Sequence, residues 1–265
     1  MFFKSANEVT PCGMFSIEHF VLLTITLACV AITLKHTKNM EKEKIKKLIR
    51  KTTIFLWILE IIKIIFNIKN YGVNQVNKYV PLYFCSLILY TGILSGFCKG
   101  TLKKMGDVFL STGGIIAGLI FLIYPLTSLT SYPALHYISL HSFALHGIMV
   151  YIGMLMLITK YTTIEKMDII YYSAIIVIIS GIAYIVNLKF DSNLMFISQN
   201  YPGTYIEIIY NNTGRFFTLF MTIAQATMPF YIVYGIYSLV KSKKKERFNE
   251  EIENKTEEKE KIYSH

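Results

Sequence analysis

The sequence predicts an all-α membrane protein, a bundle of helices that crosses the bilayer several times. Of its 265 residues, 53% are hydrophobic, and the mean hydropathy is +0.45, which is more apolar than a soluble domain of this length. The apolar residues form runs close to the roughly 20 residues that a helix needs to span a hydrocarbon core. Charged clusters and turn residues separate these runs.

Seven runs are long enough to be spans, and we expect helices because only helices or closed barrels satisfy their backbone groups in lipid. The expected spans cover about residues 15–34, 53–69, 80–98, 107–127, 138–159, 168–188 and 215–240. The second span is the least apolar, since it carries Glu60 and Lys63. Residues 190–214 are broken by Asn, Pro and Gly, and this pattern predicts an interfacial or re-entrant segment.

The distribution of Lys and Arg predicts the orientation of these spans. Three alternate loops hold eight, three and two of them, and the C-terminal tail holds eight more, whereas the loops on the other side hold four. By the positive-inside rule the N-terminus lies outside and the C-terminus in the cytoplasm. We therefore expect a membrane domain over residues 1–240, followed by a charged cytoplasmic tail over 241–265 that is disordered.

Composition also excludes some classes of function. The net charge of +10 lies beside apolar spans, where lipid headgroups are its natural partners, so nucleic-acid binding is not expected. The four cysteines form no Cys-x-x-Cys pair, and neither a metal site nor a cofactor is expected. The frequent Ile, Lys and Asn indicate an AT-rich genome, so a bacterial plasma membrane is the expected location.

Polar side chains inside the expected spans are the first candidates for function, because burying them in lipid costs free energy. The predicted topology gathers nearly all of them in the outer half of the membrane. They are His19, Glu60, Lys63, Cys85, His141, His146 and Asn187. Glu60 and Lys63, three residues apart, share one helix face.

A thiol and an imidazole in this group suggest nucleophilic catalysis. Cys85 becomes a nucleophile if His146 or His141 takes its proton, and the amides of Asn187 or Asn193 could steady an oxyanion. Each group also has a structural interpretation. Cys85 could be a small apolar side chain or form a disulfide with Cys12, Glu60 and Lys63 could simply neutralise each other, and His19 could anchor the helix at the interface.

Several motifs, taken in order, resemble the YwaF-like bacterial membrane proteins and the transmembrane protein 164 family of eukaryotes. The first is Pro81-Leu-Tyr-Phe-Cys85 at the head of the third span, where Pro81 suits the first turn of a helix. A Gly-rich fourth span then ends at Pro125, a Leu145-His146-Gly147 motif follows, and an Asn closes the sixth span before Asn193-Leu-Met-Phe. The family's Asn-Tyr pair is Asn193-Leu194 here. The likeness runs from about residue 15 to 240.

The resemblance implies an acyltransferase or lipid hydrolase that acts on phospholipid esters, with Cys85 as nucleophile and His146 as base. Its partners would be membrane phospholipids, including an acyl-donor lipid. A second hypothesis is a small-molecule transporter or ligand-sensing protein that uses Glu60, Lys63 and the histidines. A third is a non-catalytic scaffold. The acyl chain, the headgroup and the oligomeric state are left open.

Overall fold

The structure is a computed structural model that describes the backbone of residues 2–263 and the side chains of 2–244, 246 and 247. Its regular elements in that range are helices joined by turns and loops. No strand occurs in that range. The α-helices are α1 (Ile17–Thr37), α2 (Lys42–Tyr71), α3 (Val76–Tyr79), α4 (Leu87–Phe97), α5 (Gly100–Ser111), α6 (Gly113–Ile123), α7 (Tyr137–Ile158), α8 (Ile169–Phe190), α9 (Tyr205–Thr213) and α10 (Phe217–Tyr263). Short 3-10 turns lie at Ala6–Glu8, Lys166–Asp168, Leu194–Phe196 and Gly214–Phe216.

Five of the described helical stretches are long and apolar enough to cross a membrane. They are Ile17–Thr37, Gly100–Ile123, Tyr137–Ile158, Lys166–Phe190 and Tyr205–Lys244. Helix α2 has 30 residues but carries charges along its length, and α4 is apolar but has only 11 residues. The protein is therefore an integral membrane protein by length and composition.

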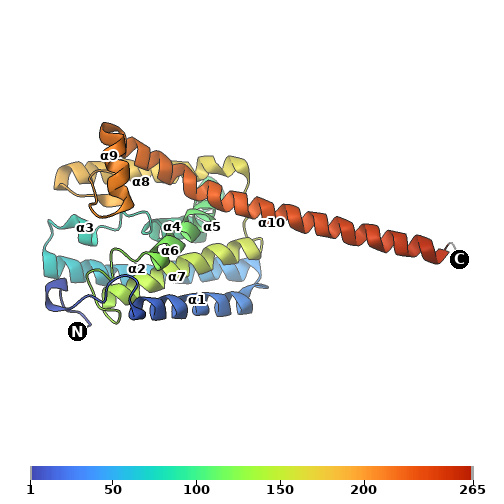
Figure 1. Cartoon of the computed structure of the whole chain (residues 1–265), viewed down its shortest axis with the longest axis horizontal. Helices are drawn as coiled ribbons and strands as arrows, with labels where there is room; N and C mark the ends of the chain where they lie inside the picture. The colour runs from blue at the N-terminus through green and yellow to red at the C-terminus, as the bar shows by residue number, and fades with distance from the viewer. Residues whose placement is uncertain (1, 264–265) are drawn as a thin grey trace.

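The helices pack as a bundle whose two ends carry different parts of the chain. The N-terminus lies at the same end of the bundle as α3 and α9, and α10 extends beyond the other end (Figure 1). Helix α7 packs against α1, α2, α5 and α6, while α8 packs against α10. Because α7 has neighbours on most sides, most of its residues are buried, and the buried residues occur on several faces of the helix.

Close backbone contacts hold these helices together, as is common between membrane helices with small residues at their interfaces. At Gly118 of α6, a Cβ atom would lie 2.8 Å from the carbonyl oxygen of His146 on α7. At Gly106 of α5, it would lie 2.5 Å from the backbone nitrogen of Ser95 on α4. Both glycines therefore set the distance between neighbouring helices.

Several boundaries differ from those expected from hydropathy. Helix α2 begins at Lys42 rather than near 53, because Ile45 and Ile49 of the basic segment are buried against the bundle. A break at Thr112 divides the fourth expected span into α5 and α6. The structure continues α10 as a helix to Tyr263, through the tail for which the sequence predicted disorder.

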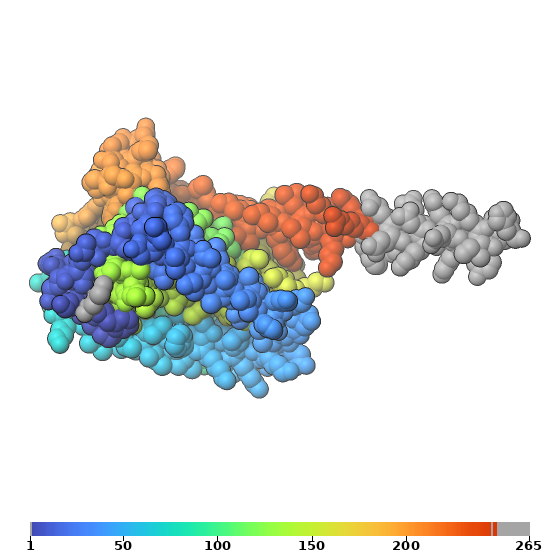
Figure 2. All heavy atoms as spheres, turned by 60° about the horizontal axis from the view of Figure 1, so that its bottom comes forward, coloured from blue at the N-terminus to red at the C-terminus, as the bar shows by residue number. Residues whose placement is uncertain are grey.

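The N-terminal segment covers one end of the bundle. The backbone nitrogens of Cys12 and Gly13 donate to the carbonyl oxygens of Tyr132 and Leu129 in the loop before α7. In the space-filling view, these N-terminal residues surround that loop (Figure 2). Tyr71 at the end of α2 joins the same contact, since its hydroxyl accepts a hydrogen bond from the backbone nitrogen of Ala6.

Candidate functional site

Cys85 lies in an irregular segment just before α4. Residues 80–86 form turns in which the backbone nitrogen of Ser86 donates to Tyr83 and that of Leu87 donates to Phe84. The expectation that Pro81 opens a helix was therefore wrong, because these turns delay the helix to Leu87. Cys85 is partly buried and packs against the core formed by α2, α4 and α7. It lies at a helix N-terminus, a position that favours a negative charge.

Glu60 forms the centre of a charged group that joins α2 to α7. Its carboxylate is fully buried; Oε1 accepts a hydrogen bond of 2.7 Å from Lys63 Nζ. Oε2 lies 3.2 Å from Nε2 of His141, which is close enough for an ion pair but lies outside hydrogen-bond geometry. This contact is an ion pair only when the imidazole is protonated. Lys63 remains partly exposed, with 22% of its side chain accessible.

His146 is buried one and a half turns after His141 on α7. Its Nδ1 lies 2.6 Å from the carbonyl oxygen of Ser142, and its ring stacks on Phe121 of α6 at 3.7 Å between centroids. A carbonyl oxygen only accepts hydrogen bonds, so Nδ1 carries the hydrogen in the neutral ring and Nε2 carries a lone pair. Nε2 is buried and has no hydrogen-bond partner among the described residues. His146 thus has the form of a neutral base.

We use the name polar cluster for Glu60, Lys63, Cys85, His141 and His146. Within it, Glu60 contacts Lys63 at 2.7 Å and His141 at 3.2 Å. Among the described residues, no hydrogen bond joins Cys85 to either histidine. Within the cluster, one oxygen of Glu60 and three imidazole nitrogens are buried without a hydrogen-bond partner.

His141 and His146 are five residues apart, a spacing that turns them about 140° from each other around α7. His141 meets α2 through Glu60, whereas His146 meets α6 through Phe121. Both are buried because α7 has neighbours on both sides. Sequence reasoning did not identify Ser142 or Phe121. Ser142 stands four residues before His146, the spacing at which a helical carbonyl could have been anticipated as a partner.

Asn187, in the last turn of α8, and Asn193, in the compact loop after α8, hold the backbone of that loop with their amides. Asn187 Nδ2 donates to Leu194 O and Ser198 Oγ, and its Oδ1 accepts from the Ser192 hydroxyl and the Leu194 backbone nitrogen. Asn193 likewise accepts from the backbone nitrogens of residues 198 and 199. Since these amides are occupied by the loop, they are not free to bind an oxyanion as the loop stands.

His19 connects the start of α1 to the end of α6. Its Nδ1 accepts a hydrogen bond of 3.1 Å from the backbone nitrogen of Phe15, and its Nε2 donates to Leu122 O at 2.9 Å. Both ring nitrogens are therefore used inside the fold. The interfacial anchor suggested for this residue stays a prediction.

The four cysteines are free thiols, so Cys12 and Cys85 do not form a disulfide. The Cys12 thiol lies 3.8 Å from the carbonyl oxygen of Tyr132. In the described part of the chain, His, Cys, Asp and Glu form no group of three or more placed to hold a metal ion.

A second buried acid, Asp107 of α5, escaped the sequence reasoning. Its carboxylate accepts a hydrogen bond of 2.5 Å from Ser95 and pairs with Lys103. Asp107 is a lone acid inside an apolar run, four residues after Lys103, and this pattern could have indicated a helical ion pair. All the charged groups in this pair have partners, and we assign it to the packing of α4 against α5.

An apolar helical bundle with a buried polar cluster defines a polytopic α-helical membrane protein. A comparison with family models matches residues 14–235 to the TMEM164 family, and the chain belongs to that family. This agrees with the resemblance read from the motifs. Comparisons with curated proteins and with solved structures gave no significant match.

Proposed function

We propose that the protein is a phospholipid acyltransferase or lipid hydrolase, in which the thiol of Cys85 attacks an acyl ester and His146 acts as base. One observation carries the proposal. Nε2 of His146 is a buried lone pair with no hydrogen-bond partner among the described residues, which suits a general base. Family membership agrees with this chemistry, because the motifs that carry the resemblance include both residues.

We further propose seven spans, with α2 and the segment containing α4 added to the five long apolar helices. An odd number of spans is supported by the N-terminus and the tail, which lie at opposite ends of the bundle (Figure 1). The charge distribution supports an outside N-terminus and a cytoplasmic tail over residues 241–265. The polar cluster then lies in the outer half of a plasma membrane, where phospholipid esters can reach it.

In the proposed reaction, His146 Nε2 takes the proton of the Cys85 thiol while the sulfur forms a bond to the ester carbonyl carbon. The ester carbon–oxygen bond breaks, and the leaving alcohol oxygen of the donor lipid takes the proton from His146. A hydroxyl group of an acceptor lipid, or water, then gives its proton to His146 and attacks the thioester. The carbon–sulfur bond breaks, the acyl group is transferred, and the thiol takes back its proton.

The remaining members of the cluster support charge development. Lys63 is the cation of the cluster, and we propose that it stabilises the thiolate and the oxyanion of each tetrahedral intermediate. The backbone N–H of Cys85, just before α4, donates to no backbone oxygen among the described residues. It is therefore a second hydrogen-bond donor for the oxyanion. Glu60 holds Lys63 and His141 in place from the buried side.

The test is acyl transfer by the purified full-length protein from a labelled phosphatidylcholine donor to a lysophospholipid in mixed micelles. Cys85→Ala should lower the rate about a thousandfold or more, as the loss of a nucleophile does. Cys98→Ala, a thiol at the end of α4 outside the polar cluster, is the matched control. A labelled acyl group should be trapped as a thioester on Cys85 and released by hydroxylamine. Full activity of folded Cys85→Ala would refute the proposal.

A transporter or ligand-sensing function has one specific observation in its favour. Glu60 Oε2 and both nitrogens of His141 are buried without hydrogen-bond partners, which suits a proton-relay site. Proton flux into liposomes, followed with an internal pH-sensitive dye, tests it. Flux that Glu60→Gln abolishes and Cys85→Ala leaves intact would favour this function over acyl transfer.

A further inference from the structure

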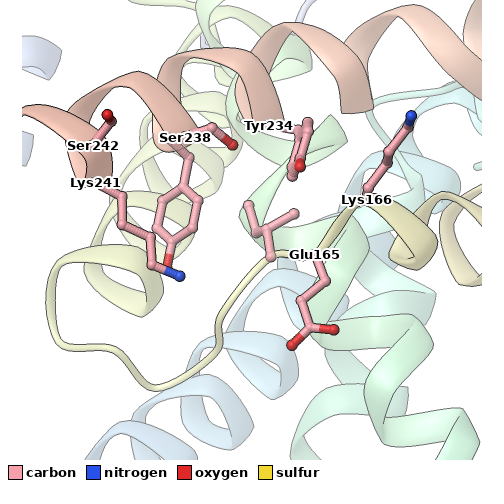
Figure 3. A pocket seen from close by; sticks show the side chains of 8 residues that line it. Glu165, Lys166, Tyr234, Ser238, Lys241 and Ser242 are labelled. Atoms are coloured by element: carbon pink, nitrogen blue, oxygen red, sulfur yellow. The ribbon is translucent and has the colours of Figure 1, made fainter.

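A cleft of about 370 Å³ opens at the end of the bundle opposite the N-terminus, between the loop that precedes α8 and the last apolar turns of α10. Figure 3 shows that Tyr234 and Ser238 come from α10 on one side, while Glu165 and Lys166 come from the loop on the other. Neither side belongs to the polar cluster. The cleft is therefore a separate feature of the fold.

The cleft lies where the protein leaves the apolar core of the membrane. Leu239 and Val240 of α10 are more than 60% exposed, as lipid-facing residues are, and the basic residues of the tail begin at Lys241. On the other wall, Lys166 stands three residues before the apolar helix α8 begins at Ile169. Tyrosines between an apolar run and a basic segment are typical of the membrane interface.

The lining supplies hydrogen-bond donors and positive charge. Lys166 and Lys241 contribute two ammonium groups, and neither forms an ion pair with any side chain that the structure describes. The hydroxyl groups of Tyr234, Tyr237 and Ser238 have no hydrogen-bond partner in that same part of the chain. The two tyrosine rings pack against the core, so the positions of their hydroxyls are fixed by the fold.

Two carboxylates lie near these donors, and neither neutralises the lysines. Glu165 lines the cleft, but its side chain runs away from α10 (Figure 3). Glu246, one turn further along α10, accepts a hydrogen bond of 3.2 Å from Ser242. The net character of the cleft is therefore that of an anion site with an apolar wall beside it.

We propose that this cleft binds the phosphate-bearing headgroup of an anionic glycerophospholipid from the leaflet next to the C-terminal tail. Basic pockets between membrane helices on the cytoplasmic side are a recognised form of such sites. Lys166 and Lys241, which flank the cleft from opposite ends (Figure 3), would attract the phosphate electrostatically, and the tyrosine and serine hydroxyls would bind the polar headgroup. The acyl chains would lie along the exposed apolar side chains of α10. This inference is independent of acyl transfer at Cys85.

The experiment titrates dioleoyl phosphatidylglycerol into the detergent-purified full-length protein and counts bound lipid by native mass spectrometry. Lys166→Gln/Lys241→Gln should weaken binding about thirtyfold, the fold-change that corresponds to on the order of 1 kcal/mol for each lysine near a lipid phosphate. The matched control is Lys243→Gln/Lys244→Gln, which removes the same charge from α10 outside the cleft and should change binding less than about twofold. Tyr237→Phe, which keeps the ring in the core, is the second variant and should also weaken binding.

Each further outcome decides the proposal. Dioleoyl phosphatidylcholine should bind much more weakly than the anionic lipid. Equal loss in both double variants would overturn the proposal, because binding would then follow charge alone. Displacement of the lipid by millimolar glycerol 3-phosphate or inorganic phosphate would show that the site takes soluble phosphate instead. An unchanged affinity in folded Tyr237→Phe and in the cleft double variant would also overturn it.

Discussion

His146 donates a hydrogen bond from Nδ1 to the carbonyl oxygen of Ser142, across 2.6 Å and one turn of α7. This bond fixes which ring nitrogen carries the hydrogen, and it leaves the lone pair of Nε2 buried and without a partner. A side-chain substitution at Ser142 cannot remove the bond, because the acceptor is a backbone oxygen. The tautomer of His146 is therefore a property of the helix itself.

We expect His146→Gln to lower acyl transfer about 100- to 10,000-fold, as the loss of a general base does. It should also slow the alkylation of Cys85 by iodoacetamide at pH 7.5, because the thiol loses its proton acceptor. His19→Gln is the control, since His19 uses both nitrogens inside the fold. Labelling of Cys85 at the wild-type rate in folded His146→Gln would remove His146 from the role of base.

The Glu60–Lys63 pair gives a prediction about stability. Lys63→Met leaves the carboxylate of Glu60 buried without its cation, and breaking a buried pair costs about 3 kcal/mol, less here because Lys63 is partly exposed. The double variant Glu60→Leu/Lys63→Met removes both charges and should be more stable than Lys63→Met. Thermal unfolding in detergent measures all three proteins. A double variant less stable than Lys63→Met would show that the pair is not the main interaction.

The sequence was sufficient for the helical class and the family, because apolar runs and short motifs are local signals. It could not place Asn187, since the loop that satisfies its amide is formed by residues 192–198, which carry no periodic pattern. Nor could it distinguish His141 from His146. Their difference depends on neighbours from α2 and α6, and contacts between distant helices leave no trace in spacing. The break of the helix at Thr112 could not be predicted either, because it lies inside a continuous apolar run.

His136 gives a prediction about pH, because it lies outside the spans and joins the N-terminal segment to the bundle. Its Nδ1 accepts from the backbone nitrogen of Ile138 and its Nε2 donates to Lys4 O. Tyr132 stacks on the ring, and Phe66 meets its edge. Burial among these groups lowers the pKa of His136 below its usual value of 6.5.

A histidine whose pKa is lowered in the folded protein binds fewer protons there than in the unfolded chain, so stability rises with pH. The contribution of His136 is therefore complete above about pH 6.5 and falls as the pH drops below that value. His136→Asn keeps a side chain suited to cap α7 but cannot titrate. The difference in melting temperature between wild type and variant should change between pH 7.5 and 5. A constant difference across that range would contradict the assignment.

Gly118 offers the sharpest test of how α6 and α7 are packed around His146. A Cβ at Gly118 would lie 2.8 Å from the His146 carbonyl oxygen, and a backbone atom cannot move aside as a flexible side chain can. Gly118→Ala should therefore destabilise the protein by about 1–3 kcal/mol, as overpacking does. Gly181→Ala in α8 is the matched control, because nothing lies within 4 Å of its Cβ position and alanine favours a helix. We expect the melting temperature to fall for Gly118→Ala and to hold or rise for Gly181→Ala. Since the displaced oxygen belongs to His146, Gly118→Ala should also lower acyl transfer more than its loss of stability explains.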